Sequence, residues 1–330
     1  MFPRQDRWVI ASIGLACVCL SILSLSLGSG GSLVGLWNEE AGIHALIVEV
    51  RLPRVLGCLA AGALLGLGGL LAQALFRNPL ADPYLLGTAS GAELSVTLVY
   101  AAGLGTLSLP WLASLGTVIA AFCGAWLALA FSLVLVPKAS DRFAQAHAGL
   151  LLAGLVVALV LGAISNLLTH IQPELLRYRQ AFTLGQTSLI GWDGVWQMLL
   201  ALSVCLFLAQ SRVHVLDALT LGLPTAASLG LAIDKERNRV VVLMAACTAM
   251  VVAHAGLIGF VGLLAPHAVR PFVAGMHRSL MLASALSGAL LLSLADLVAR
   301  TLWMPQEIPT GMLTAVLGGI FLLGLLRKKT

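Results

Sequence analysis

The stretch RLPRVLGCLAAGALLGLGGLLAQALFRNPLADP, from Arg51 to Pro83, decides the fold. Two arginines open it, a glycine-rich apolar run follows, and the polar turn RNPLADP closes it. A helix of about 20 apolar residues spans the hydrocarbon core of a bilayer. The stretch therefore predicts a transmembrane helix that has cations at one end and a tight turn at the other.

The composition of the whole chain agrees with a membrane protein. Of its 330 residues, 59% are hydrophobic and 10% are charged, whereas soluble domains carry about 25% charged residues. The six cysteines lie inside apolar runs and form no CxxC pair, so they are interpreted as small buried side chains rather than as a disulfide or zinc framework. The net charge of +5 is spread between apolar runs, which favours membrane orientation over nucleic-acid binding.

Hydropathy and length predict an all-α polytopic membrane protein, with a single transmembrane domain over 1–330. The expected spans are 8–28, 52–76, 84–103, 110–136, 146–169, 192–210, 239–256, 258–270, 279–299 and 308–326. The eighth is too short to cross comfortably, so a partly re-entrant helix is expected there. We interpret the first span as uncleaved; a cleaved signal peptide is the alternative.

Charge predicts the orientation of these spans. With the N-terminus in the cytoplasm, fourteen of the 19 Lys and Arg residues fall on the cytoplasmic side. The five on the outer side are Arg51, Arg54, Arg177, Arg179 and Arg300. Because cytoplasmic loops of membrane proteins are enriched in Lys and Arg, both termini are expected in the cytoplasm.

One long polar segment interrupts the spans, at 211–239. It is rich in helix formers and broken by Gly222-Leu223-Pro224 and by Gly230, which predicts two short helices along the membrane surface. We interpret it as a cytoplasmic docking surface; a simple connector is the alternative. Elsewhere, the pairs Gly62/Gly66 and Gly87/Gly91 have the GxxxG spacing that lets helix backbones approach closely, here within one chain.

The sequence contains no recognised catalytic constellation. It has no GxxxxGK[ST], no HExxH, no GxSxG and no cluster of His and Cys, which disfavours an ATP-binding subunit or a membrane enzyme. Two carboxylates lie inside predicted spans. Asp296 is expected to pair with Arg300 four residues later. Glu93 is either a functional carboxylate or a side chain that reaches the cytoplasmic interface.

Several segments resemble one family, the permease subunits of ABC importers for ferric siderophores, heme and cobalamin. The resemblance is carried by the opening stretch continued through YLLGTASGA, by GLIGFVGLLAPHAVRPFVAGMHRSLMLASALSGALLLSLADLVARTL, by EIPTGMLTAVLGGIFLLGLL and by LTLGLPTAASLGLAIDKERNR. It covers nearly the whole chain in order. It implies a ten-span subunit of the bacterial inner membrane that works as a homodimer, with two separate ATPase subunits below and a periplasmic substrate-binding protein above. ATP and magnesium would bind to the ATPases, and no cofactor to this chain.

The resemblance also implies where the binding protein docks. The family's outer arginines match Arg51, Arg54 and Arg300 here. An arginine fork suits a bidentate carboxylate contact, and anchoring to lipid headgroups is the alternative role. The turn RNPLADP is interpreted as structural, with Asn78 and Asp82 as helix caps and the two prolines as breakers.

Two further sites are implied by the same resemblance. The ATPase-coupling residues would be Leu219, Thr220, Leu221, Gly222, Leu223, Pro224, Ala227, Leu229, Gly230 and Ile233. The chain departs from the family pattern at Gly222-Leu223-Pro224, where a glutamate usually follows the glycine, which puts a charged contact in doubt. The translocation pathway and its gate would be lined by Gln145, His147, Gly149, Leu151, Gly154, Ser165, Asn166, Thr169 and His170.

The chelate that this permease carries is left open by the sequence. His147 and His170 lie at opposite ends of one span, and imidazole ligates haem iron, so heme is favoured slightly over a ferric siderophore. A cobalamin importer is the alternative within the family. An ATP-independent secondary transporter that uses Glu93 is the alternative outside it.

Overall fold

The computed structural model describes residues 3–28, 31–32, 45–104, 110–135, 143–220, 223–274 and 277–329. The long helices are α1 (Arg4–Ser26), α4 (Leu52–Phe76), α5 (Thr88–Ala101), α6 (Pro110–Leu135), α7 (Phe143–Ile171), α9 (Trp192–Gln210), α12 (Ile233–Ala255), α14 (His277–Thr301) and α15 (Thr310–Lys329). The short ones are η1 (Leu46–Arg51), η2 (Pro83–Leu86), α8 (Leu175–Leu184), η4 (Thr187–Leu189), α10 (Val213–Thr220), α11 (Leu223–Ser228), α13 (Val261–Val269) and η5 (Arg270–Phe272). A two-residue antiparallel pair, β1 (Leu27–Gly28) and β2 (Gly31–Ser32), follows α1.

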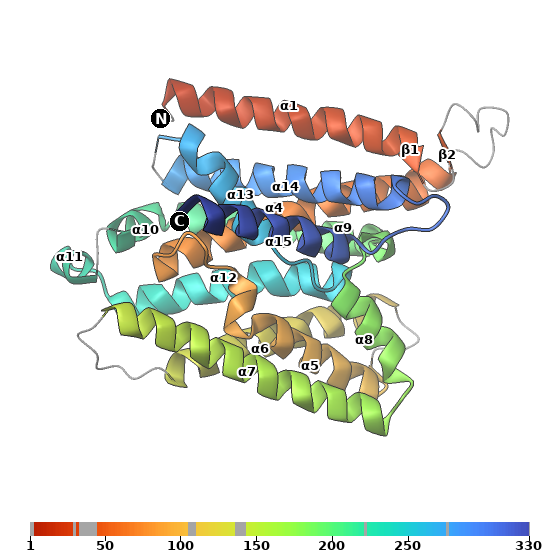
Figure 1. Ribbon diagram of the computed structural model, residues 1–330, viewed down its shortest axis with the longest axis horizontal. Coiled ribbons are helices and arrows are strands. Elements are labelled where there is room, and N and C mark those ends of the chain that lie inside the picture. Colours follow the sequence, from red (N-terminus) through yellow and green to blue (C-terminus); the bar gives the residue numbers. More distant parts are fainter. Residues whose placement is uncertain are drawn as a thin grey trace.

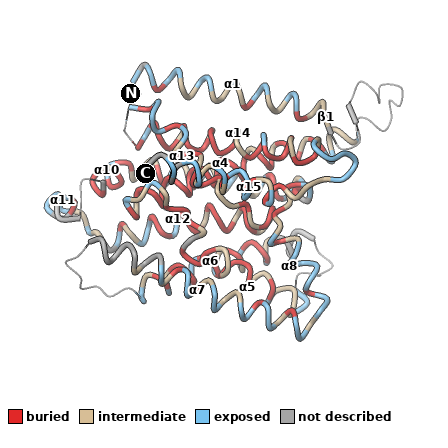
Figure 2. The backbone as a smooth tube through the Cα atoms, in the orientation of Figure 1, coloured by how far each residue is buried: buried red, intermediate tan, exposed pale blue. Residues whose placement is uncertain are grey.

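The helix predicted from the opening stretch is the centre of the bundle. Almost every residue of α4 is buried, and it packs against α14, α12, α13 and α9. In Figure 1, α1 lies along one edge beside α14, whereas α5, α6 and α7 form the opposite edge. Figure 2 shows that buried residues concentrate in α4, α12 and α14 and that α1 and α7 are more exposed. An all-round apolar helix is therefore fully enclosed by other helices, as its composition requires.

Glycines let α4 approach its neighbours at backbone distance. A β-carbon at Gly62 would overlap the Gly288 carbonyl oxygen, and one at Gly66 would overlap that of Ser284, both in α14. Gly69 meets Gly262 of α13, and Gly91 of α5 meets α6. The predicted close approaches therefore lie within one chain.

Most predicted spans match helices within a few residues, with three differences. Seven described helices are long and apolar enough to cross a membrane, and α15 contains a shorter apolar segment. The span expected at 84–103 is broken at Gly87, whose φ of 81° separates η2 from the 14-residue α5. The expected short helix at 258–270 is α13, only nine residues long. The helix α8 had no counterpart in the prediction, because its sequence is too polar for a span.

The two ends of the bundle differ in what they carry. Figure 1 places both termini, α10 and α11 toward the left-hand end, and β1, β2 and α8 at the right-hand end. The predicted orientation assigns the first end to the cytoplasm and the second to the outside. They are called the inner and outer ends below.

Candidate functional site

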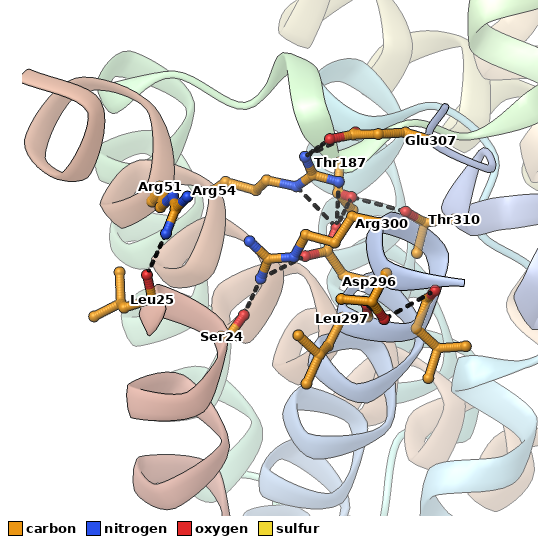
Figure 3. Close-up of polar contacts among 12 residues, drawn as sticks. Ser24, Leu25, Arg51, Arg54, Thr187, Asp296, Leu297, Arg300, Glu307 and Thr310 are labelled. Carbon is orange, nitrogen blue, oxygen red and sulfur yellow. Dashed lines mark hydrogen bonds and ion pairs between the residues drawn. The ribbon is translucent and has the colours of Figure 1, made fainter. Parts of the chain in front are cut away.

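The arginines predicted to dock a partner lie at the outer end, where Arg54 and Arg300 belong to one polar cluster and Arg51 lies beside it (Figure 3). Arg54 of α4 is its hub. Its Nε and Nη2 atoms lie 3.0 Å from Oδ1 of Asp296 in α14. Its Nη1 donates to both carboxylate oxygens of Glu307, at 3.0 and 2.9 Å. The guanidinium is thus held between two carboxylates.

Asp296 collects further donors. Arg300, one helical turn along α14, lies with its Nη2 at 3.3 Å from Oδ2 of Asp296, which confirms the predicted pair. Thr187 of η4 donates to Oδ1, and its own oxygen lies 2.8 Å from that of Thr310 in α15. Arg300 also donates to Ser24 of α1. One carboxylate therefore ties α4, α14 and η4 together, and its partners reach α1 and α15.

These arginines are buried, whereas residues of a docking surface are expected to be exposed. Arg51, Arg54 and Arg300 are 4%, 7% and 1% exposed. Arg51 turns toward the end of α1 and donates to the Leu25 carbonyl at 2.9 Å. Removing one member of a buried ion pair typically costs 3–5 kcal/mol, because the other charge is left uncompensated. Each arginine thus has a structural role, and the docking role remains a proposal.

A recess opens beside this cluster. It is small and is lined mainly by polar groups. Its lining residues are Arg54, Gln186, Thr187, Ser188, Glu307, Ile308, Pro309 and Thr310. We refer to it as the outer recess. Arg54 is the arginine of the cluster that lines this recess.

At the inner end, the structure has the two short helices that the sequence predicted in the coupling segment, α10 and α11. Leu219 packs in a small apolar cluster with Val215, Ala218 and Ala226, against which Ile233 also packs. Leu229 is 62% exposed, and Gly230 has the positive φ of 78° that ends α11. Leu221 and Gly222 lie outside the described residues, as do the side chains of Thr220, Leu223, Pro224 and Ala227.

Ion pairs fix this segment to the bundle. Asp217 of α10 accepts from the backbone N–H of His277 at 3.3 Å and lies 2.5 Å from its Nδ1, at the start of α14. Arg212, which precedes α10, pairs with Glu236 of α12 at 3.1 Å. The coupling segment is therefore anchored to two long helices.

The predicted pathway helix, α7, has two different faces. Ser165 and Thr169 are buried, and Thr169 donates to the Ser165 carbonyl. Asn166 and His170 are exposed, on a face that also carries exposed large apolar side chains. Those apolar residues are Leu152, Leu155, Val156, Leu159, Val160, Ile164, Leu167 and Ile171.

The inner part of α7 is described less fully. Gly154 is buried, and its carbonyl borders Gly87 at the break before α5. Gly149 is half-buried. The side chains of Gln145, His147 and Leu151 lie outside the described part of the structure.

Glu93 has a partner that the sequence did not indicate. Its carboxylate accepts from Nε of Arg179 in α8 at 2.8 Å and is 8% exposed. It therefore reaches toward α8, at the outer end, rather than toward the cytoplasmic interface. Beside this pair, Tyr100 of α5 stacks on Tyr178 of α8 with ring centroids 4.2 Å apart.

Several members of the outer cluster were missed by sequence reasoning. Thr187, Glu307, Thr310 and Ser24 lie far along the chain from Arg54, in loops or at helix ends. The number of charges could have indicated them. Three outer arginines lie in or beside predicted spans, and one carboxylate cannot compensate three cations that are buried. In the described residues no group of three or more His, Cys, Asp or Glu side chains is arranged to hold a metal ion.

Comparisons with known proteins agree along almost the whole length. A model of the FecCD transport family matches residues 11–328. The hemin transport system permease protein HmuU of Yersinia pestis is 36% identical over 96% of this chain and 95% of that protein. The vitamin B12 import system permease protein BtuC of Citrobacter koseri is 35% identical over 98% of this chain and 95% of that protein.

Solved structures share the fold. One that shows an inward-facing conformation of a metal-chelate type ABC transporter superposes with a TM-score of 0.83, at 29% identity, over 98% of this chain and 100% of that chain. PsaBC from Streptococcus pneumoniae, in complex with Fab, gives a TM-score of 0.63 at 14% identity, over 85% of this chain and 92% of that chain. At this low identity, the comparison with PsaBC shows a shared fold only.

Proposed function

This chain belongs to the FecCD transport family, and from that membership we propose that it carries a bulky metal chelate, heme first, across the bacterial inner membrane by alternating access. It is a multi-pass membrane protein and a transport subunit of an ABC importer. The observation that carries the proposal is the family match over residues 11–328 on a bundle whose two ends are built differently.

Energy for transport would come from outside the chain. The sequence has no phosphate-binding GxxxxGK[ST] loop, so ATP and magnesium would bind to two separate ATPase subunits. Their docking surface would be α10, α11 and the turn that follows, with exposed Leu229 as a contact. The contacts Asp217–His277 and Arg212–Glu236 connect this segment to α14 and α12. They support a role in transmitting motion, because a docking surface can move the long helices only if it is attached to them.

The pathway would lie along the exposed face of α7. A second copy of the chain would cover this face, so that the two copies form a largely aliphatic route between them. Exposed apolar side chains support such a partner or lipid, and the exposed Asn166 and His170 among them support a route that polar edges of a chelate can follow.

Heme is favoured over cobalamin by one residue of this chain. His170 is exposed near the outer end of α7, where its imidazole could contact haem iron. Among the relatives, a hemin permease and a vitamin B12 permease are about equally similar, at 36% and 35% identity. Cobalamin is therefore the second candidate.

A periplasmic binding protein would dock at the outer end, with acidic side chains directed at the cluster around Arg54. An ATP-independent transporter that relies on Glu93 has less support, because Glu93 is already held in a buried pair with Arg179. Glu93→Gln would abolish transport by such a carrier, whereas an ATP-driven importer would keep its coupling to ATP.

The test is reconstitution in liposomes with the ATPase and the binding protein encoded beside this chain. Heme, ferric siderophores and cobalamin are supplied in turn, and ATP hydrolysis and uptake are measured. Stimulation by heme is expected. The double variant His147→Ala, His170→Ala should lower heme uptake several-fold and leave the unstimulated ATP hydrolysis unchanged, with Ser203→Ala, at an exposed position of α9 outside the proposed pathway, as the control. Uptake without ATP would refute the proposed energy source.

A further inference from the structure

The two carboxylates on Arg54 are held in different ways. Asp296 lies within α14, and its side chain is 1% exposed. Glu307 lies in the connection between α14 and α15, and its side chain is 27% exposed. The same guanidinium is therefore bound on one edge by an enclosed carboxylate and on the other by a carboxylate that borders solvent.

The enclosed partner cannot be exchanged without disrupting the bundle. Asp296 also interacts with Arg300 and Thr187, which come from two elements. Removing it would leave buried Arg300 without its carboxylate and Arg54 with one of its two, at a typical cost of several kcal/mol. Glu307 lies instead in a surface connection, and both of its hydrogen bonds to Arg54 go to a single guanidinium nitrogen, Nη1.

The outer recess is where a replacement would enter. Both Arg54 and Glu307 line it, together with the hydroxyl-bearing residues Thr187, Ser188 and Thr310. Because the Nε and Nη2 edge of Arg54 faces Asp296, an incoming anion can reach only the edge that Glu307 occupies. A carboxylate suits that edge because one is already bound there with good geometry.

We propose that Glu307 is an internal competitor at a carboxylate-binding site on Arg54, and that an acidic side chain of the docking protein takes its place. The inference rests on the proposed function, because it requires a protein that docks at the outer end. When an acidic side chain of the docking protein replaces Glu307, one carboxylate contact is lost as another forms, so the net gain in binding free energy is small. Glu307 therefore weakens docking and makes release of the partner easier. The site is thereby set for repeated docking rather than for permanent binding.

The affinity of the full-length permease in detergent for the substrate-binding protein encoded beside it tests this directly. Glu307→Gln removes the competing charge and keeps the shape, so the dissociation constant should fall about tenfold. Glu174→Gln is the matched control, because Glu174 is an exposed residue at the start of α8 and the charge change is the same. The control should change the constant less than twofold.

A second background separates competition from a general charge effect. In Arg54→Gln the gain from Glu307→Gln should vanish; if thermal melting shows that this variant is unfolded, Arg54→Met, which also removes the charge, replaces it. Equal gains in Glu307→Gln and Glu174→Gln, no gain, or a gain that persists without Arg54 would each overturn the competition. If the wild-type chain does not bind the protein at all, the docking itself is wrong, and the inference falls with it.

Discussion

Asp82 is a carboxylate enclosed by protein in the turn between α4 and η2. It is 7% exposed, and its Oδ1 accepts from the backbone N–H of Tyr84 at 2.8 Å, which caps η2 as the sequence predicted. The backbone N–H of Phe260, just before α13, also bonds to it. Burial raises the pKa of Asp82 to about 6, because loss of water disfavours the charged form more than these bonds favour it.

This raised pKa predicts a pH-dependent stability. The unfolded chain releases the proton near pH 4, whereas the folded chain keeps it until about pH 6. At this residue the folded state therefore binds more protons in this window, and the stability that Asp82 contributes should fall as the pH rises from 4 to 6, by up to about 3 kcal/mol. Asp82→Asn should remove that slope, since the amide oxygen can still accept from the backbone. Thermal unfolding in detergent between pH 4.5 and 7.5 measures it.

The control for this titration is Glu174→Gln, at an exposed carboxylate at the start of α8. It should leave the slope as it is in the wild-type chain. An unchanged slope in Asp82→Asn would mean that another group titrates in this window.

Residues also show how far the site could be predicted. The Asp296–Arg300 pair followed from a spacing of four on one helix, which fixes their proximity locally. The contact of Arg54 with Asp296 joins residues 242 positions apart, and that with Glu307 joins residues 253 apart. No local pattern encodes such pairs, so the sequence indicated cations at the outer end but not that Arg54 is neutralised within the chain.

At the scale of elements, α4 illustrates why helix boundaries were predictable and helix partners were not. Its apolar run and the polar turn after Phe76 set its length, which agrees with the predicted 52–76. Its glycines indicated a close neighbour, but only the folded chain identifies α14 as that neighbour. The break at Gly87 was missed because hydropathy continues across it, and only a positive φ reveals the end of η2.

The contact between α4 and α14 predicts a large effect from a single methyl group. In Gly62→Ala the added β-carbon would overlap the Gly288 carbonyl oxygen, so the two helices must separate. We expect a loss of about 1–3 kcal/mol, seen as a lower melting temperature in detergent. Gly14→Ala in α1 is the control, because no atom lies within 4 Å of its added β-carbon. There, alanine should be neutral or stabilising by up to about 1 kcal/mol. Equal melting temperatures for the two variants would contradict the close packing.

At the scale of the whole molecule, a single helix connects the two sites. His277 begins α14 at the coupling segment, and Arg300 lies near its end in the outer cluster. Its 25 residues give a length of about 37 Å. Through glycines, α14 packs against α4 at backbone distance. Contacts at the outer end and at α10 therefore act on the same body, an arrangement that sequence order alone does not reveal.

The orientation of this body in the membrane is predicted by charge. Figure 1 places both termini and α10 toward one end of the bundle, so they should all face one side of the membrane. Because most Lys and Arg residues fall at that end, it should be the cytoplasmic one. A fluorescent protein fused after Thr330 should fluoresce, since it folds in the cytoplasm. Alkaline phosphatase fused after Gln172, between α7 and α8, should be active, since it requires export. If the phosphatase were active at the C-terminus instead, the bundle would have the opposite orientation in the membrane. The cluster around Arg54 would then face the ATPases rather than a binding protein.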